Sequence, residues 1–328
     1  KAVEEFNQAL KLNVENEHVH FGLGLCYHQK EEYEKAIEEF DKVLRINLQH
    51  PQVKYHLELC HMQLGHAYFD KKNYPEAITQ FKKALELNPQ NVDSYENLGF
   101  CYLEQRSIEE ALTKFNQAFK LNFKNGHVHF GLGLCYHQKK EYDKAIEEFR
   151  QALKINPNDE YAHQDLGFCY FRKGQIEKSI EEFNQAIKVN PQNEDAAQGL
   201  GYAHLHQKQY TLAQEAFNKA IGINANSTSA HQGLGTLYLE KELYDLAEKE
   251  FKKVLQFGSD NIFIYQMLGY IHKRQGKHEL AVNEFIKATN LYLAREGANK
   301  KSINFTENKS ISLIDNNGKF AVKILRMP

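Results

Sequence analysis

The stretch YAHQDLGFCYFRKGQIEKSIEEFNQAIKVNPQN, at Tyr161–Asn193, contains two helical patterns in succession. Apolar residues at helical spacings mark the first pattern (Tyr161, Leu166, Cys169 and Tyr170) and the second (Ile176, Ile180, Phe183 and Ile187). Gly174 lies between them in a short turn, and Pro191 ends the second pattern. The stretch therefore predicts two antiparallel helices.

The same pattern recurs along most of the chain with a fixed period. Phenylalanine recurs every 34 residues, except that the step from Phe40 to Phe81 is 41 residues. Glycine and alanine keep this period, and Ser179 takes one alanine position. The positions are Phe6, Phe40, Phe81, Phe115, Phe149, Phe183, Phe217, Phe251 and Phe285, with glycine at Gly24, Gly65, Gly99, Gly133, Gly167, Gly201, Gly235 and Gly269. Because a stack of helix pairs buries apolar faces that one pair cannot, the period predicts an all-α solenoid.

The small residues of each pair indicate where its helices touch. Gly167 on the first helix and Ser179 on the second replace larger side chains. A glycine inside a helix costs about 1 kcal/mol relative to alanine, so its recurrence at one phase indicates close backbone approach. We expect the phenylalanine of each second helix to fill the space against the following pair.

The recurrent pattern L-G-x-x-Y … A-x-x-x-F-x-x-A … P resembles the tetratricopeptide repeat over roughly residues 1–295. The resemblance implies a right-handed superhelical α-solenoid of antiparallel helix pairs. It would comprise a partial repeat at residues 1–16 and then eight full repeats. The family often has tryptophan four residues before the glycine, but this chain has no tryptophan.

Histidine stands at that tryptophan position in five repeats, as His20, His61, His129, His163 and His231. One interpretation is a flat, half-polar packing group. The other is a pH-sensitive stack, in which protonation of buried rings opposes packing.

The segment HVHFGLGLCYHQK occurs twice, at residues 18–30 and 127–139, which indicates duplication of a three-repeat block. Its histidines do not predict a metal site, because residues two apart point to different helix faces. The five cysteines share one repeat phase, which is typical of small buried apolar residues. We therefore expect no metal ligand, no cofactor and no catalytic residue, and no combination of nucleophile and base can be assembled.

The second repeat is seven residues longer than the others. Leucine begins both LELCHMQ (57–63) and LGHAYFD (64–70), and seven residues add two helical turns with little rotation. We expect one helix from about Gln52 to Lys72. It is either a docking projection beyond the edge of the stack or a tolerated slip, and the sequence leaves open which heptad keeps the ordinary phase.

The resemblance implies that the first helices line a concave groove through positions 2, 5, 9 and 12 of each repeat, the glycine being position 8. Several of these positions are apolar or aromatic although folding does not require it, and four carry glutamines that could bind a peptide backbone. The alternative is that neighbouring side chains or the tail cover them. The predicted partner-binding residues are His18, Phe21, Leu25, His28, Glu96, Phe100, His127, Phe130, Leu134, His137, Gln164, Phe168, Phe171, Gln198, Tyr202, Gln232, Gln266 and Tyr270.

Composition argues against several classes of function. The net charge is -2, the pI is about 6.8, and no basic stripe follows the repeat phase, so we do not expect nucleic-acid binding. No apolar run approaches the roughly 18 residues of a membrane span. The odd cysteine number and the lack of a secretory signal favour a cytoplasmic setting. The chain begins with Lys1 rather than Met, so we expect a fragment.

Residues 296–328 form a tail without the repeat pattern. Alternating residues around Asn317-Gly318 predict a β-hairpin at 310–325. The leading interpretation of the whole chain is a non-enzymatic scaffold that binds a peptide or helix of a partner protein in the groove. The groove lacks the Lys/Asn clamp for an acidic chaperone C-terminus. The alternative is the recognition arm of a larger glycosyltransferase, methyltransferase or phosphatase.

Overall fold

The computed structural model describes residues 2–12, 16–257, 261–295, 303–306, 310–314 and 320–323. The chain divides into two compact units, Lys1–Asn190 and Pro191–Pro328, each with its own packed helices. The single solenoid over residues 1–295 therefore stays a prediction.

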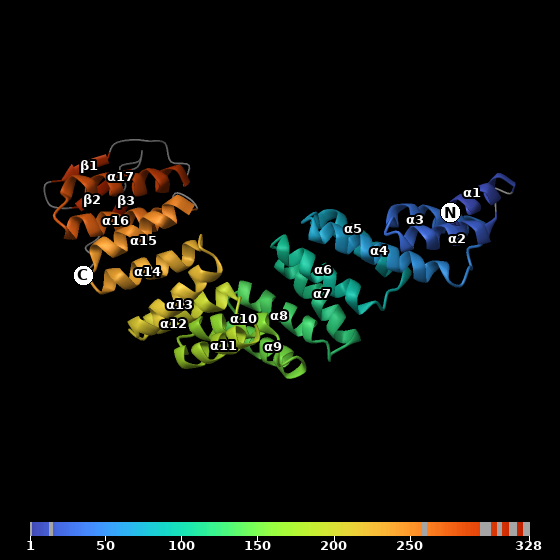
Figure 1. Cartoon of the computed structure of the whole chain (residues 1–328), viewed down its shortest axis with the longest axis horizontal. Coiled ribbons are helices and arrows are strands. Elements are labelled where there is room, and N and C mark those ends of the chain that lie inside the picture. The colour runs from blue at the N-terminus through green and yellow to red at the C-terminus, as the bar shows by residue number, and fades with distance from the viewer. Residues whose placement is uncertain are drawn as a thin grey trace. The chain divides into compact units, whose positions relative to one another are not determined.

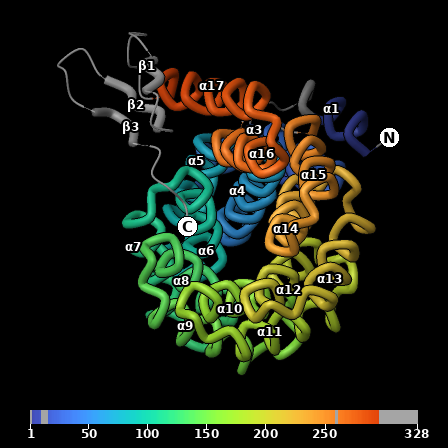
Figure 2. Tube along the Cα trace, turned by 90° about the vertical axis from the view of Figure 1, so that its left-hand side faces the viewer, coloured from blue at the N-terminus to red at the C-terminus, as the bar shows by residue number. Residues whose placement is uncertain are grey.

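The first unit is a stack of helices in which each helix packs against the next along the chain (Figure 1, Figure 2). The first helices of neighbouring repeats also contact each other: α2 contacts α4, and α8 contacts both α6 and α10. The described residues contain α1 (Ala2–Leu12), α2 (Glu17–Gln29), α3 (Tyr33–Ile46), α4 (Val53–Asp70), α5 (Tyr74–Leu87), α6 (Val92–Glu104), α7 (Ile108–Leu121), α8 (Gly126–Gln138), α9 (Tyr142–Ile155), α10 (Glu160–Arg172) and α11 (Ile176–Val189).

The second unit continues the same pattern and adds a small sheet. Its described elements are α12 (Glu194–His206), α13 (Tyr210–Ile223), α14 (Thr228–Glu240), α15 (Tyr244–Phe257), α16 (Ile262–Arg274), α17 (His278–Arg295), β1 (Ile303–Thr306), β2 (Ser310–Ile314) and β3 (Phe320–Lys323). The strands pair antiparallel in the order β1-β2-β3. β2 and β3 fall within the expected hairpin, whose Asn317-Gly318 turn lies outside the described residues, and β1 was not expected.

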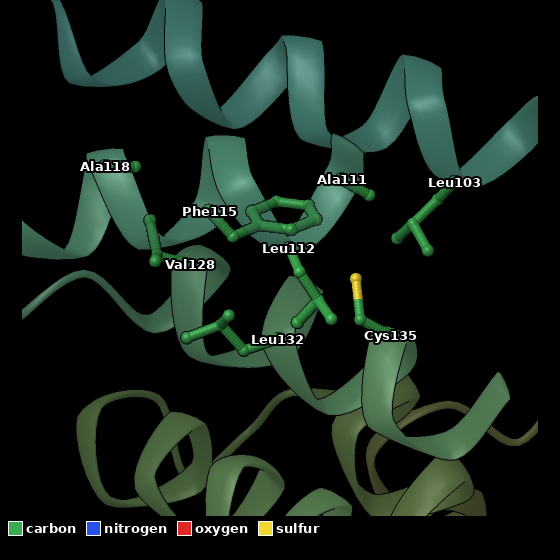
Figure 3. Packing of buried hydrophobic residues seen from close by; sticks show 8 residues of the cluster. All are labelled: Leu103, Ala111, Leu112, Phe115, Ala118, Val128, Leu132 and Cys135. Carbon is green, nitrogen blue, oxygen red and sulfur yellow. The ribbon is translucent and has the colours of Figure 1, made fainter. Parts of the chain in front are cut away.

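The recurrent phenylalanine joins its own repeat to the next one. The Phe115 ring lies between Gly99 of its own repeat and Gly131 of the next, and a Cβ atom on Gly99 would come within 2.6 Å of it. Figure 3 shows this fully buried ring above Val128 and Leu132 of α8. The expected contact with the following pair is therefore present, and contact with the repeat's own glycine is added to it.

Each repeat turns between its helices through one residue with positive φ. Glycine takes this place at Gly174 and Gly276, where left-handed backbone carries no steric cost. Elsewhere it is occupied by Glu31, Lys72, Arg106, Lys140, Lys208 and Glu242. The first helices other than α4, by contrast, begin at side-chain caps. Asn125 Oδ1, for example, accepts hydrogen bonds from the amides of the first turn of α8.

The long helix α4 packs in the ordinary phase at both of its ends. Near its start, α4 buries three residues against Phe40, namely Val53, Leu57 and Cys60. The equivalent residues of α8, which pack in the same way against Phe115, are Val128, Leu132 and Cys135. Near its end, Gly65 lies over Phe81 as the other glycines lie over their phenylalanines. The two contacts therefore lie seven residues further apart than in the other repeats, while α4, with 18 residues, is five residues longer than the 13-residue α8.

The residues between these two contacts do not stand free of the stack. Within residues 58–64, Cys60 packs in the cluster around Phe40 and Met62 in the cluster around Phe81, and both are buried. Gln63 is the exposed residue of this segment. The insertion is therefore part of the packing of the first and second repeats.

Candidate functional site

In the first unit, α2 contacts α4, and α8 contacts both α6 and α10. We call the outer sides of these five helices the first-helix face. All eighteen predicted partner-binding residues remain accessible to solvent. His18 and His127 are exposed, and the other sixteen are half-buried. Gln198, Tyr202, Gln232, Gln266 and Tyr270 belong to the second unit and the rest to the first, so the structure groups them only within each unit.

The aromatic residues of this set rest on the core. The Phe100 ring lies edge-on to the buried Phe115 ring at 5.0 Å between centroids. The same arrangement joins Phe168 to Phe183 at 4.9 Å. We expected that these positions need not be apolar for folding. In the structure, Phe100 and Phe168 nevertheless pack on core rings and present only part of their surface to solvent.

The two copies of the duplicated segment have different surroundings. In the first copy, the Phe21 ring has the ring of His50 at 4.7 Å, that of His56 at 5.5 Å and that of Phe40 at 5.8 Å. His50 precedes α4 and His56 lies in its first turn. The Phe21 ring is therefore surrounded by aromatic rings of its own and the next repeat.

In the second copy, the Phe130 ring has a ring contact with the core residue Phe149, at 5.7 Å. Counting from that core phenylalanine, the positions equivalent to His50 and His56 hold Asp159 and Asp165. The positions that supply imidazoles beside Phe21 therefore hold aspartates in the other repeat, where Asp159 caps the start of α10.

Glu96 lies where α6 meets the start of α8. Its Oε2 accepts a hydrogen bond from Asn125 Nδ2 at 3.0 Å, and its Oε1 lies 3.6 Å from His127 Nδ1. Burial raises the pKa of the Glu96 carboxyl, and the neighbouring Asp93 adds to this, whereas His127 and Asn125 lower it. A carboxylate here is poorly hydrated and is compensated only in part.

The glutamines do not form one free ladder. Gln198 Nε2 donates to Glu194 Oε1 at 2.6 Å and to Ser227 Oγ at 3.2 Å. Its amide is therefore engaged within the second unit, while Gln164, Gln232 and Gln266 are half-buried in their own repeats.

The sequence analysis missed the second repeat's share of this face. Leu59, His66 and Phe69 are half-buried there, and the His66 ring lies edge-on to Phe81 at 5.3 Å, as Phe100 does to Phe115. The signal was present, because the step from Gly65 to Phe81 equals the step from glycine to phenylalanine in every other repeat.

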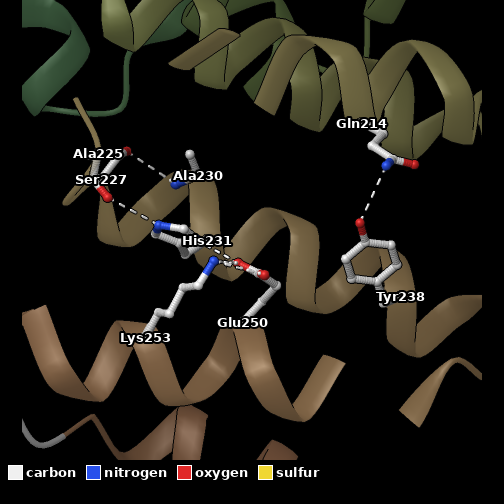
Figure 4. A network of polar contacts seen from close by, with 8 residues as sticks. All are labelled: Gln214, Ala225, Ser227, Ala230, His231, Tyr238, Glu250 and Lys253. Atoms are coloured by element: carbon white, nitrogen blue, oxygen red, sulfur yellow. Dashed lines mark hydrogen bonds and ion pairs between the residues drawn. The ribbon is translucent and has the colours of Figure 1, made fainter. Parts of the chain in front are cut away.

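The histidines at the tryptophan position pair with a glutamate of the second helix. His231 Nδ1 lies 2.6 Å from Glu250 Oε2, and its Nε2 lies 3.2 Å from the Ala225 carbonyl oxygen (Figure 4). His20 pairs with Glu39 at 2.6 Å in the same way. In the second repeat the partner is a neutral amide, Gln80, at 2.7 Å from His61. These rings tie the two helices of a repeat together.

The cysteines behave as packing residues. Cys60, Cys101, Cys135 and Cys169 are fully buried, and burial raises the pKa of each thiol to about 12. Within the described ranges, no group of three or more His, Cys, Asp or Glu side chains is arranged to hold a metal ion. Among the same residues, no helix combines the length and the apolar character needed to cross a membrane.

Several solved structures share this fold at low sequence identity. The structure titled functional characterization of Pseudomonas aeruginosa pilF matches with a TM-score of 0.56 and 21% identity over 61% of this chain and 91% of that one. The APC/C hetero-tetramer Cut9–Hcn1 matches with a TM-score of 0.61 and 16% identity over 90% of this chain and 56% of that one. A tetratricopeptide repeat protein from Parabacteroides merdae matches with a TM-score of 0.55 and 20% identity over 78% of this chain and 98% of that one.

Family comparisons are more specific. No curated protein sequence matches the chain. Residues 264–294 match a tetratricopeptide-repeat family, and residues 1–233 match the family described as cilia and flagella-associated protein 70 C-terminal domain. Because the latter match spans more than half of the chain, the chain belongs to the family of the cilia and flagella-associated protein 70 C-terminal domain, and its repeats are tetratricopeptide repeats.

Proposed function

We propose that the chain is a protein-interaction scaffold that binds a peptide or helix of a partner protein on its first-helix face. The observation that carries this is the half-buried aromatic series on that face, above all Phe130, which packs on the core ring of Phe149 and remains partly accessible. Contiguous apolar surface of this kind, with polar neighbours, is typical of protein-binding sites. The tetratricopeptide fold is consistent with such a scaffold.

The family's name supports a place for this scaffold in cilia or flagella, within the cytoplasmic compartment. We propose a role without catalysis or a cofactor, in keeping with scaffold families of this fold. The alternative, a recognition arm of a larger glycosyltransferase, methyltransferase or phosphatase, gains no support from the family match. Imaging of a tagged full-length protein in ciliated cells tests the location, and exclusion from the cilium would contradict it.

The binding face is tested by site-specific photocrosslinking. A benzophenone side chain replaces Phe130 in one variant and the exposed Phe123 of the neighbouring loop in the other. Both are mixed with an extract of ciliated cells, and circular dichroism confirms that both fold. We expect one protein to crosslink at position 130 and not at 123. Crosslinking of the same protein from both positions, or from 123 alone, would place the partner away from this face.

A further inference from the structure

Negative charge is concentrated on part of the first-helix face. Helix α6 carries Asp93, Glu96 and Glu104 and no lysine or arginine, and α8 carries no Asp, Glu, Lys or Arg. The second helices beside them are balanced, since α7 has two acidic and two basic residues and α9 has three of each. The excess charge of this region therefore belongs to the first helices.

Several cations lie around these helices. The Lys139 ammonium group is 2.8 Å from Glu109 on α7, and Lys114 of α7 lies over the Tyr95 ring of α6 at 5.8 Å. On α8, burial and the charge of Arg172 lower the pKa of His137. Among the described residues, however, no lysine or arginine forms an ion pair with Asp93, Glu96 or Glu104, and only His127 lies near Glu96.

The carboxylates on α6 differ in environment but are all accessible. Asp93 and Glu104 are exposed, and Glu104 accepts a hydrogen bond from the Tyr74 hydroxyl at 3.1 Å. Glu96 is the most buried, with 16% of its side chain exposed. A cationic group beside Glu96 would supply the charge compensation that its burial withholds, and the exposed Asp93 would add a second, solvated carboxylate next to it.

An apolar strip lies on the same two helices. Phe100, Phe130 and Leu134 are half-buried and pack on the clusters around Phe115 and Phe149. Apolar anchors beside acidic side chains complement a helix with one apolar face and basic flanks.

The first copy of the duplicated segment has a different neighbourhood. The rings of His50 and His56 lie beside its Phe21 ring. In the second copy, the Phe130 ring contacts Phe149, and Glu96 lies beside the start of α8. The acidic neighbour is therefore described for the second copy, which we take as the candidate surface.

We propose that α6 and α8 bind a basic amphipathic helix, with apolar side chains against Phe100 and Phe130 and lysine or arginine side chains beside Asp93 and Glu96. This inference rests on the proposed function and specifies the partner's chemistry. Charge complementarity selects this occupant over an acidic or neutral helix.

Two fluorescent synthetic peptides test the inference on the full chain by anisotropy. They share one leucine pattern, and their polar positions carry lysine in one and glutamate in the other. We expect the lysine peptide to bind at least about tenfold more tightly, with a preference that falls between about 50 and 200 mM salt. The double variant Asp93→Asn/Glu96→Gln should weaken the lysine peptide about three- to tenfold. Its matched control, Glu110→Gln/Glu147→Gln, removes the same charge from second helices.

Phe130→Ala should weaken both peptides about tenfold, and Phe123→Ala is its control. The inference is overturned if both peptides bind equally well, or if the two charge variants weaken binding of the lysine peptide equally. In either case the proposed function still stands provided that Phe130→Ala weakens binding. Binding that is insensitive to Phe130→Ala, or the absence of binding by either peptide, counts against the first-helix face itself and against this inference.

Discussion

His163 Nδ1 lies 2.6 Å from Glu182 Oε2, and the Nε2 of the same ring lies 3.1 Å from the Pro157 carbonyl oxygen. Both partners only accept hydrogen bonds, so both ring nitrogens are satisfied only when the ring carries two protons. Burial by itself lowers the pKa of His163. The hydrogen bonds to Glu182 and Pro157, with the charges of Glu182 and Asp159, outweigh it and raise the pKa above its usual value.

This pair predicts a pH-dependent contribution to stability. The folded-state pKa lies above the unfolded value, so the stabilisation is complete below about pH 6.5 and is lost as the pH rises through the folded-state pKa. Glu182→Gln should therefore lower the free energy of unfolding by about 1–2 kcal/mol at pH 6 and by less at pH 9. Urea unfolding at both values measures this, and an equal loss at the two would contradict it.

The second repeat provides the opposite case. His61 faces the neutral amide of Gln80, and burial lowers the pKa of this ring despite that hydrogen bond. We expect His61 to titrate below His163 when followed by NMR of the imidazole resonances. Gln80→Glu should raise the pKa of His61 and leave that of His163 unchanged. If His61 does not respond to the new carboxylate, charge pairing is not what sets these pKa values.

The glycine–phenylalanine contact predicts opposite effects of one substitution at two sites of the second unit. A Cβ atom on Gly201 would lie 2.5 Å from the Phe217 ring, whereas one on Gly222 would meet nothing within 4 Å. We expect Gly201→Ala to destabilise by about 2 kcal/mol through overpacking. Gly222→Ala should instead stabilise α13 by about 0.5 kcal/mol, because alanine favours helix. Denaturant unfolding of both variants decides, and similar effects would argue against a tight contact at Gly201.

The turn positions predict a second matched pair. Lys140 has φ of 61° and Gly174 has φ of 71° at equivalent places in successive repeats. Lys140→Gly should relieve left-handed strain and stabilise the chain by about 1 kcal/mol, whereas Gly174→Ala should cost a similar amount. Thermal melts followed by circular dichroism give the two shifts in melting temperature. Shifts of the same sign would show that backbone strain does not govern these turns.

The repeat period predicted much of the fold, because residues such as Gly99 and Phe115 recur where the same contact recurs. It could not distinguish Phe21 from Phe130, since their local sequences are the same and the difference comes from His50 and His56 on another segment. The expected effect of histidine protonation had the wrong sign for His163, because that sign depends on a partner 19 residues away. Glutamate recurs 19 residues after four of these histidines, as Glu39, Glu148, Glu182 and Glu250, and it opposes the effect of burial.

The phase of α4 predicts which deletions the chain tolerates. Removing Glu58–Leu64 would join Leu57 directly to Gly65. The spacing from Phe40 to this glycine would then equal the spacing from Phe115 to Gly133 in an ordinary repeat. We expect this variant to fold with native-like helical content and to unfold cooperatively in urea. Leu57 would then precede the glycine as Leu132 does in α8.

A shorter deletion serves as the control. Removing only Glu58–Met62 would rotate the glycine face of α4 by about 140° relative to its start, because each residue turns the helix by about 100°. Gly65 could then no longer meet Phe81 while Val53 stays against Phe40. We expect loss of cooperative unfolding in this variant, although it removes fewer residues. If the shorter deletion unfolds at the same urea concentration as the longer one, then the two ends of α4 are not coupled through helical phase.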